Sequence, residues 1–95
     1  MAPSQFGIFT KSDKRFDTPN IEFHIQPLSL DSFGKPLHKF PGLTVSVCNL
    51  RPLSRGTVSL SSSNPFDKPK IAPNYLSDYE DQQVAVESIL KAREL

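Results

Sequence analysis

Nine prolines divide this 95-residue chain, against only four glycines. Proline fixes the backbone angle φ and has no N–H to donate, so it ends strands and interrupts helices. The composition therefore predicts many stiff turns between the elements of regular structure. Pro27 ends one strand-like stretch, Pro52 opens a turn, and a proline-interrupted extended segment runs on to Pro73.

Residues 21–26 alternate strictly between apolar and polar side chains. Period two with β-branched and aromatic residues predicts a strand. One face carries Ile21, Phe23 and Ile25, and the other carries Glu22, His24 and Gln26. Residues 28–42 are predicted to form a long loop, followed by strands at about 43–51 and 57–61.

The connection between those last two strands is the short run Pro-Leu-Ser-Arg-Gly, residues 52–56. It predicts an antiparallel hairpin in which Gly56 supplies a permissive backbone. Residues 1–19 look irregular instead. Their three phenylalanines are expected to cover a hydrophobic surface, in this chain or in a piece absent from it: Phe6, Phe9 and Phe16.

A helix is predicted at about 78–94. Ser77 can cap its N-terminus, and Glu80 three residues later completes a capping box. An apolar stripe at helical spacing is expected to pack on a sheet: Ala85, Val86, Ile89 and Leu90. Strands followed by one helix predict an α+β fold with an antiparallel sheet and a C-terminal helix packed on it.

Length and charge exclude several classes of function. Ninety-five residues form one small domain at most. A formal net charge of +1 gives no attraction to nucleic acid or to an anionic membrane. No apolar stretch reaches the roughly 18 residues of a membrane span, and the N-terminus lacks the regions of a signal peptide, so a cytoplasmic location is expected. The single cysteine, Cys48, excludes an internal disulfide and is expected to be a buried thiol.

Common catalytic and cofactor motifs are missing from the chain. No two of its glycines are close enough for a dinucleotide fingerprint or a phosphate loop. Neither His24 nor His38 has the further ligands of a metal site at a recognisable spacing. No Gly-x-Ser-x-Gly elbow surrounds Ser54. We therefore expect no catalytic residue, no cofactor-binding residue and no metal ligand within these 95 residues.

Two polar groups of residues remain as candidates for binding. His24 and Gln26 share the polar face of a strand, which either lines a pocket or simply contacts solvent. Arg51 continues the face of Asn49, so it could reach a pocket lined by that face. Arg55 is better explained as a structural residue that ties the turn together through its guanidinium.

Four stretches together resemble the glucose–methanol–choline (GMC) oxidoreductases, especially the choline-dehydrogenase-like alcohol dehydrogenases. They are Thr18-Pro-Asn-Ile-Glu-Phe-His24, Val47-Cys-Asn-Leu-Arg-Pro52, Ser54-Arg-Gly-Thr-Val58 and Ala72-Pro-Asn-Tyr-Leu-Ser-Asp78. With looser similarity at the N-terminus and in the loop 33–38, the match covers nearly the whole chain. Each motif alone is weak, whereas the set is specific.

The resemblance implies a flavoprotein that oxidises an alcohol by passing hydride to FAD. It places this chain in the substrate-binding region of such an enzyme, as a fragment that is inactive alone and needs missing FAD-binding and C-terminal segments. FAD and a small alcohol are then the cofactor and the substrate of the full-length enzyme, with FAD not bound by this fragment. The resemblance also makes His24, Gln26, Asn49 and Arg51 plausible substrate-pocket residues.

Two alternatives stay open at this point. The chain could be a stand-alone small module that binds a ligand or a partner chain. It could also be a complementing subunit of a split flavoenzyme.

Overall fold

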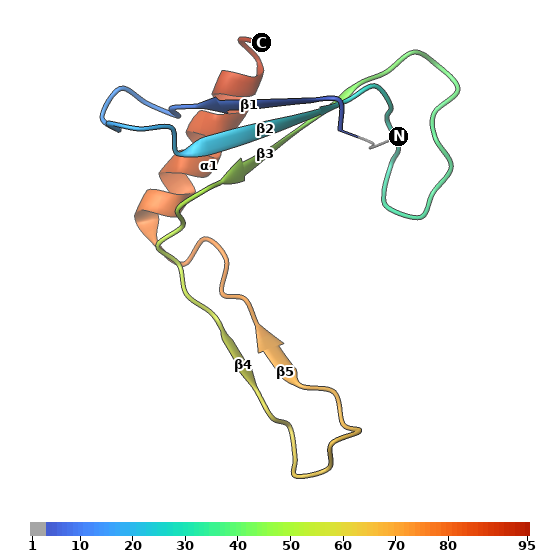
Figure 1. The fold of residues 1–95 in the computed structure, drawn as a ribbon, viewed down its shortest axis with the longest axis vertical. Helices are drawn as coiled ribbons and strands as arrows, with labels where there is room; N and C mark the ends of the chain where they lie inside the picture. The colour runs from blue at the N-terminus through green and yellow to red at the C-terminus, as the bar shows by residue number, and fades with distance from the viewer. Residues whose placement is uncertain (1–3) are drawn as a thin grey trace.

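The chain forms an α+β structure, as predicted, and a computed structural model describes residues 4–95. Its three-stranded antiparallel sheet has the order β1-β2-β3, and a separate two-stranded antiparallel ribbon consists of β4 and β5. Figure 1 shows α1 lying across one face of the sheet, while the ribbon projects away from it. The elements are β1 (Phe6–Thr10), β2 (Ile21–Gln26), β3 (Thr44–Asn49), β4 (Thr57–Ser59), β5 (Lys70–Ala72) and α1 (Tyr79–Ala92).

The core lies between β2 and α1 and is very small. Ile21 and Phe23 are fully buried on one face of β2, and Val84 of the helix packs against them. Partly buried side chains surround this centre: Ile8, Phe16, Val45, Val47 and Ala92. The alternation of β2 places Ile21 and Phe23 in the core, while Ile25 on the same face is only partly buried. The fold depends on three fully buried apolar side chains.

β1 corrects the expectation that residues 1–19 are irregular. Phe6–Thr10 pairs antiparallel with β2, with Ile8 opposite the buried Phe23. This cross-strand neighbour, rather than local alternation, selects the strand. Of the three phenylalanines there, Phe16 packs against the core, whereas Phe6 and Phe9 remain exposed, Phe6 by 70%.

The prediction of a hairpin between β3 and β4 is wrong. β3 pairs with β2, and β4 pairs with β5, a strand that the sequence did not reveal. Residues 52–56 instead lead the chain out of the sheet and into the ribbon (Figure 1). Gly56 is needed for close packing, since a Cβ there would lie 2.3 Å from the carbonyl oxygen of Ala72 and 2.4 Å from that of Pro73.

The helix begins one residue later than predicted and buries a different face. Asp78, not Ser77, is the N-cap, and its carboxylate accepts the backbone N–H of Glu80 at 2.9 Å. The buried helix residues are Asp81, Val84 and Ser88. Three members of the expected apolar stripe are more than half exposed instead: Val86, Ile89 and Leu90. Within residues 4–95 no helix has the length and apolar character to cross a membrane.

Two polar residues can occupy the buried helix face because both are hydrogen-bonded there, one within the helix and the other to the end of the sheet. The Ser88 hydroxyl donates to the carbonyl oxygen of Val84 at 2.6 Å, one turn back. Asp81 accepts several donors from the end of the sheet, described below. A buried polar group costs little once it is hydrogen-bonded, so the rotation of α1 follows these contacts rather than its most apolar stripe.

Candidate functional site

The three-stranded sheet has one face covered by α1 and one face that no described element packs against. We call the second the open face; it carries Glu22, His24, Gln26, Ser46 and Cys48. Because side chains alternate along a strand, these residues point away from the core formed by Ile21 and Phe23. The side chain of His24 is 42% accessible, and the amide of Gln26 donates to the Ser4 hydroxyl at 3.3 Å. Two predicted pocket residues therefore lie side by side here.

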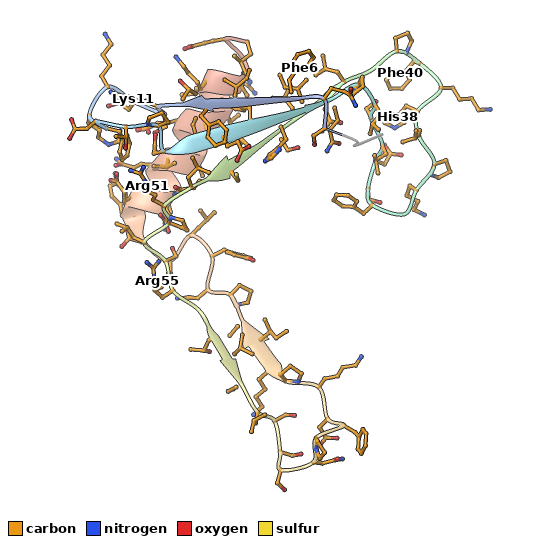
Figure 2. All side chains as sticks on the ribbon, in the orientation of Figure 1. Phe6, Lys11, His38, Phe40, Arg51 and Arg55 are labelled. Carbon is orange, nitrogen blue, oxygen red and sulfur yellow. The ribbon has the colours of Figure 1, made fainter. Side chains whose placement is uncertain are left out.

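Asn49 and Arg51 lie elsewhere. Asn49 is opposite Ile21 in the ladder, so it faces α1, and its side-chain amide donates to Asp81 at 3.2 Å. Arg51 follows the end of β3 and donates to the Thr18 hydroxyl at 2.7 Å. Figure 2 shows Arg51 near the end of the sheet, with Arg55 farther along at the base of the ribbon. The structure thus brings together His24 and Gln26 but not all four residues.

Asp81 is the polar residue that sequence reasoning missed at this junction. Its carboxylate accepts the backbone N–H groups of Leu53 at 2.9 Å and of Ser54 at 2.7 Å, and the side chain is almost inaccessible, at 3%. Hydrogen bonds from the side chain of Ser54, then from those two N–H groups, lower the pKa of the Asp81 carboxyl. An acid in the first turn of a helix indicates only a favourable helix dipole, so the residues alone do not distinguish this role.

The corner before the helix is held in an unusual backbone conformation. Asn74 and Leu76 have φ of 53° and 56°, a region that side chains other than asparagine and aspartate rarely adopt. The Asn74 side chain donates to the carbonyl oxygen of Arg55 at 3.0 Å. The guanidinium of Arg55 in turn donates to the Pro52 carbonyl at 2.6 Å. Arg55 has the structural role that its sequence position indicates.

A cavity of about 420 Å³ lies behind this corner, between α1 and the end of β3. Asn49, Asp81 and Ser88 are among its polar lining residues, and Leu76 and Ile89 are among the apolar ones. Arg51 does not line it. The polar groups of Asn49, Asp81 and Ser88 are directed to one another or to backbone atoms, so the cavity offers mainly apolar surface.

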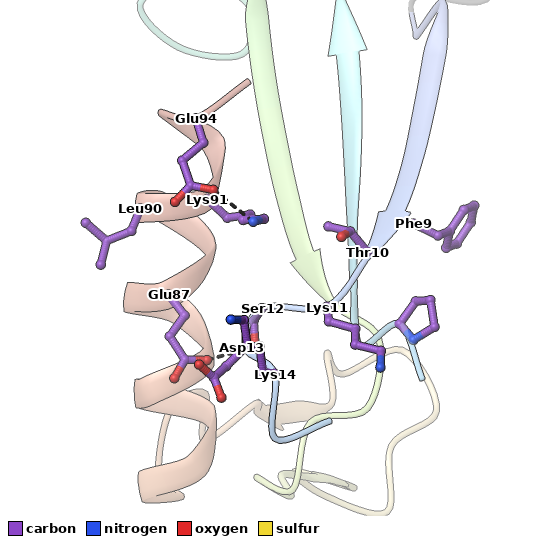
Figure 3. A pocket seen from close by; sticks show the side chains of 11 residues that line it. Phe9, Thr10, Lys11, Ser12, Asp13, Lys14, Glu87, Leu90, Lys91 and Glu94 are labelled. Atoms are coloured by element: carbon purple, nitrogen blue, oxygen red, sulfur yellow. Dashed lines mark hydrogen bonds and ion pairs between the residues drawn. The ribbon is translucent and has the colours of Figure 1, made fainter. Parts of the chain in front are cut away.

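A second, wider cavity of about 700 Å³ lies between the C-terminal half of α1 and the β1–β2 connection (Figure 3). Several of its charged groups are paired. The Ser12 hydroxyl donates to Glu87 at 2.8 Å, and Lys91 pairs with Glu94 at 2.8 Å. The guanidinium of Arg15 also bonds Glu87, and this contact raises the pKa of Arg15. The bonds from Ser12 and Arg15 to Glu87 attach the β1–β2 connection to α1. The cavity therefore does not form a binding site lined by charges of a single sign.

The open face also brings Cys48 next to Glu22 and His24, a grouping that the sequence pattern does not show. Glu22 and His24 are neighbours along β2, and Cys48 of β3 is the cross-strand partner of Glu22. The ring nitrogen Nε2 of His24 lies 3.6 Å from Oε1 of Glu22. Cys48 is exposed, which corrects the expectation of a buried thiol, because the register of β3 places Val47 and not Cys48 toward the core.

Comparison with known proteins identifies a family for the C-terminal part of the chain. Residues 52–95 match the sequence model described as GMC oxidoreductase. These residues belong to the GMC oxidoreductase family. The resemblance found in the sequence motifs is therefore confirmed, and the relatives described next extend it beyond residues 52–95.

Curated relatives match nearly all of this chain. Over 86 residues, or 90% of the chain, it is 42% identical to "Alcohol dehydrogenase [acceptor]" of Pseudomonas putida. Over 89 residues, or 94% of the chain, it is 37% identical to "Oxygen-dependent choline dehydrogenase" of Staphylococcus haemolyticus and of Staphylococcus aureus strain JH9. The chain spans 16% of the length of each of these relatives.

Proposed function

We propose that this chain contributes part of the substrate-binding region of an FAD-dependent oxidoreductase that acts on CH–OH groups of small alcohols. The family match over residues 52–95 and the names of the relatives support this activity. The single structural observation that carries the proposal is the one-sided burial of β2. Its apolar face builds the core, whereas its polar face remains open with His24 and Gln26 side by side.

On this proposal, His24 and Gln26 contact the alcohol. Each side chain has hydrogen-bonding groups that can meet a hydroxyl, and His24 engages only Glu22 among the described residues, at 3.6 Å. FAD accepts the hydride in this family. It would be held by other segments, since this chain has no glycine-rich phosphate-binding motif. Asn49 and Arg51 do not lie on the open face. In the proposed substrate-binding region they support the end of β3: Asn49 bonds to α1, and Arg51 bonds to Thr18.

A chimera tests the proposal. The segment of the Pseudomonas putida alcohol dehydrogenase that matches this chain is replaced by this chain, and alcohol-dependent reduction of a dye is measured. We expect the chimera to bind flavin and to oxidise alcohol. Loss of flavin binding and turnover in a correctly folded chimera would contradict the proposed role.

The substrate contact is tested in the same chimera by His24→Ala. We expect a KM for alcohol raised about fivefold, because loss of one hydrogen bond to substrate costs about 1 kcal/mol. The matched control is His38→Ala. His38 is not on the open face, and it hydrogen-bonds to Ser29 and Asp31 within its own loop. Equal KM values for the two variants would remove His24 from the substrate site.

A further inference from the structure

The open face combines three different metal-ligating groups in one place. A carboxylate oxygen of Glu22, a ring nitrogen of His24 and the Sγ of Cys48 all lie within 4.8 Å of one another. The grouping comes from the register of two strands: position 24 follows position 22 on the same face of β2, and Cys48 stands directly opposite Glu22. Sequence spacing alone could not supply this third ligand, because 24 residues separate His24 from Cys48.

We propose that Glu22, His24 and Cys48 form a binding site for Zn²⁺ or a chemically similar divalent ion. Thiolate, imidazole and carboxylate are the three protein ligand types of zinc. Mg²⁺ and Ca²⁺ need oxygen ligands throughout, so a set with one sulfur and one nitrogen disfavours them. Three protein ligands leave the fourth tetrahedral position to water or to a small ligand from solvent.

The distances suit this ion after small side-chain rotations. Bonds of about 2.0–2.3 Å to a tetrahedral centre place neighbouring ligand atoms about 3.3–3.8 Å apart. His24 and Glu22 already have atoms 3.6 Å apart, and the widest separation, at most 4.8 Å, must close by about 1 Å. Such a change requires rotation about side-chain bonds and leaves the strand register as it is.

The surroundings leave the cluster free to bind. In the described part of the chain, Glu22 and Cys48 make no side-chain hydrogen bond, and Glu22 and His24 form no ion pair outside the cluster. The cross-strand partner of His24 in β1 is Gly7, which carries no side chain. A Cβ at Gly7 would lie 3.5 Å from Oε1 of Glu22, so a larger residue there would extend over the ligands. An ion can therefore reach the site directly from solvent.

Charge balance favours a divalent ion over a monovalent one. Binding displaces the thiol proton of Cys48 into solvent, so that the thiolate and the Glu22 carboxylate together supply two negative charges. These match the two positive charges of the ion, and His24 and water add none. Because the ligands come from two strands, the bound ion would also join β2 to β3.

Cobalt titration of the 95-residue chain tests the site, with Co²⁺ as a coloured substitute for Zn²⁺. We expect one equivalent of Co²⁺ to produce thiolate-to-cobalt charge-transfer absorption together with the visible bands of tetrahedral cobalt, and Zn²⁺ to abolish both. Glu22→Gln and His24→Gln should each weaken binding at least about tenfold, the low end of the loss seen when only an outer-shell partner is removed. Cys48→Ser should abolish the charge-transfer band.

Matched controls use the same residue types outside the cluster. His38→Gln and Glu94→Gln should leave the cobalt spectrum and the affinity unchanged. His24→Cys keeps three ligands and adds a second thiolate, so its charge-transfer band should be stronger than that of the parent. This variant distinguishes loss of a ligand from loss of folding.

Two outcomes would overturn the proposal. One is a chain that gives no charge-transfer band. The other is a band that Glu22→Gln and His24→Gln leave unchanged, which would mean that cobalt binds the Cys48 thiolate alone. The site shares His24 with the proposed substrate contact, but the titration uses only the metal, so its result is independent of alcohol oxidation.

Discussion

Asn49, at the last position of β3, donates its side-chain amide to the carboxylate of Asp81 in the first turn of α1, across 3.2 Å. The same carboxylate holds the backbone of Leu53 and Ser54. One buried acid thus joins the end of the sheet, the start of the ribbon and the start of the helix. The stability of this junction should depend on the charge of that acid.

Asp81→Asn should lower the apparent unfolding temperature of the chimera. The new amide would direct an N–H group at a backbone N–H group, which leaves buried donors unsatisfied. Because the folded-state pKa of Asp81 lies below its ordinary value of 3.8, its ionised form stabilises the fold fully above that value. The stabilisation is lost as the pH falls through the lower, folded-state pKa.

The control for this pH dependence is Asp17→Asn, at an exposed position. We expect the difference between parent and Asp81→Asn to be large at neutral pH and to shrink below pH 3.8, with Asp17→Asn close to the parent throughout. A deficit in Asp81→Asn that stays constant as the pH falls through this range would show that the charge of Asp81 does not stabilise the junction.

Phe23→Ala should destabilise the fold by about 3–5 kcal/mol, the usual cost of deleting a fully buried phenylalanine. Among residues 4–95 the core has only two other fully buried apolar side chains, so little packing remains to fill the cavity. Thermal unfolding of the chimera measures the effect. Phe66→Ala is the control because Phe66 is 91% exposed, and a change there should stay within about 0.5 kcal/mol. Similar losses from both variants would contradict the assignment of the core.

Gly56→Ala should destabilise the base of the ribbon by about 1–3 kcal/mol, since its Cβ would overlap two backbone carbonyl oxygens that cannot rotate away. The control is Gly7→Ala, whose Cβ meets its nearest atom at an ordinary 3.5 Å and should be tolerated. Protease sensitivity of residues 56–73 in the chimera reports the local effect. Equal sensitivity in the two variants would mean that the close approach at Gly56 is relaxed in solution.

The 95-residue chain alone should bind no FAD and reduce no dye with alcohol. No segment of it has the glycines that cradle a pyrophosphate. Its core is also so small that we expect only marginal amide protection, concentrated in β2 and α1. Flavin absorbance after gel filtration and hydrogen exchange check both points. Retained flavin, or strong protection that extends into the ribbon, would contradict them.

Local patterns predicted the elements whose residues carry their own periodicity. The alternation of Ile21–Gln26 predicted β2 with its bounds, and the apolar spacing and charges of the last 20 residues predicted a helix. The sequence did not predict β1 and β5, because each forms through pairing with its partner strand. Ile8 lies opposite Phe23, and Ile71 lies opposite Val58. Strands that form only through their pairing register cannot be predicted from local alternation alone.

The same limit applied to the candidate site. His24 and Gln26 were placed on one face because position 24 and position 26 alternate within one strand. The sequence could not show that the side chain of Asn49 would donate to Asp81, a residue 32 positions away, or that Arg51 would not line the same cavity as Asn49. The pairing of Cys48 with Glu22 was likewise hidden, because it depends on how two strands align.

The hydrogen bond between Asn49 and Asp81 closes a loop of 32 residues that contains the whole ribbon. In a flexible loop, doubling the length adds only about 0.6 kcal/mol to the entropy of closure. Both ends of the ribbon are fastened to the sheet and the helix, while its far turn, residues 61–69, is exposed. That turn is therefore the natural place to insert an epitope tag or a fluorescent reporter, and evolution has the same freedom to change its length without moving His24.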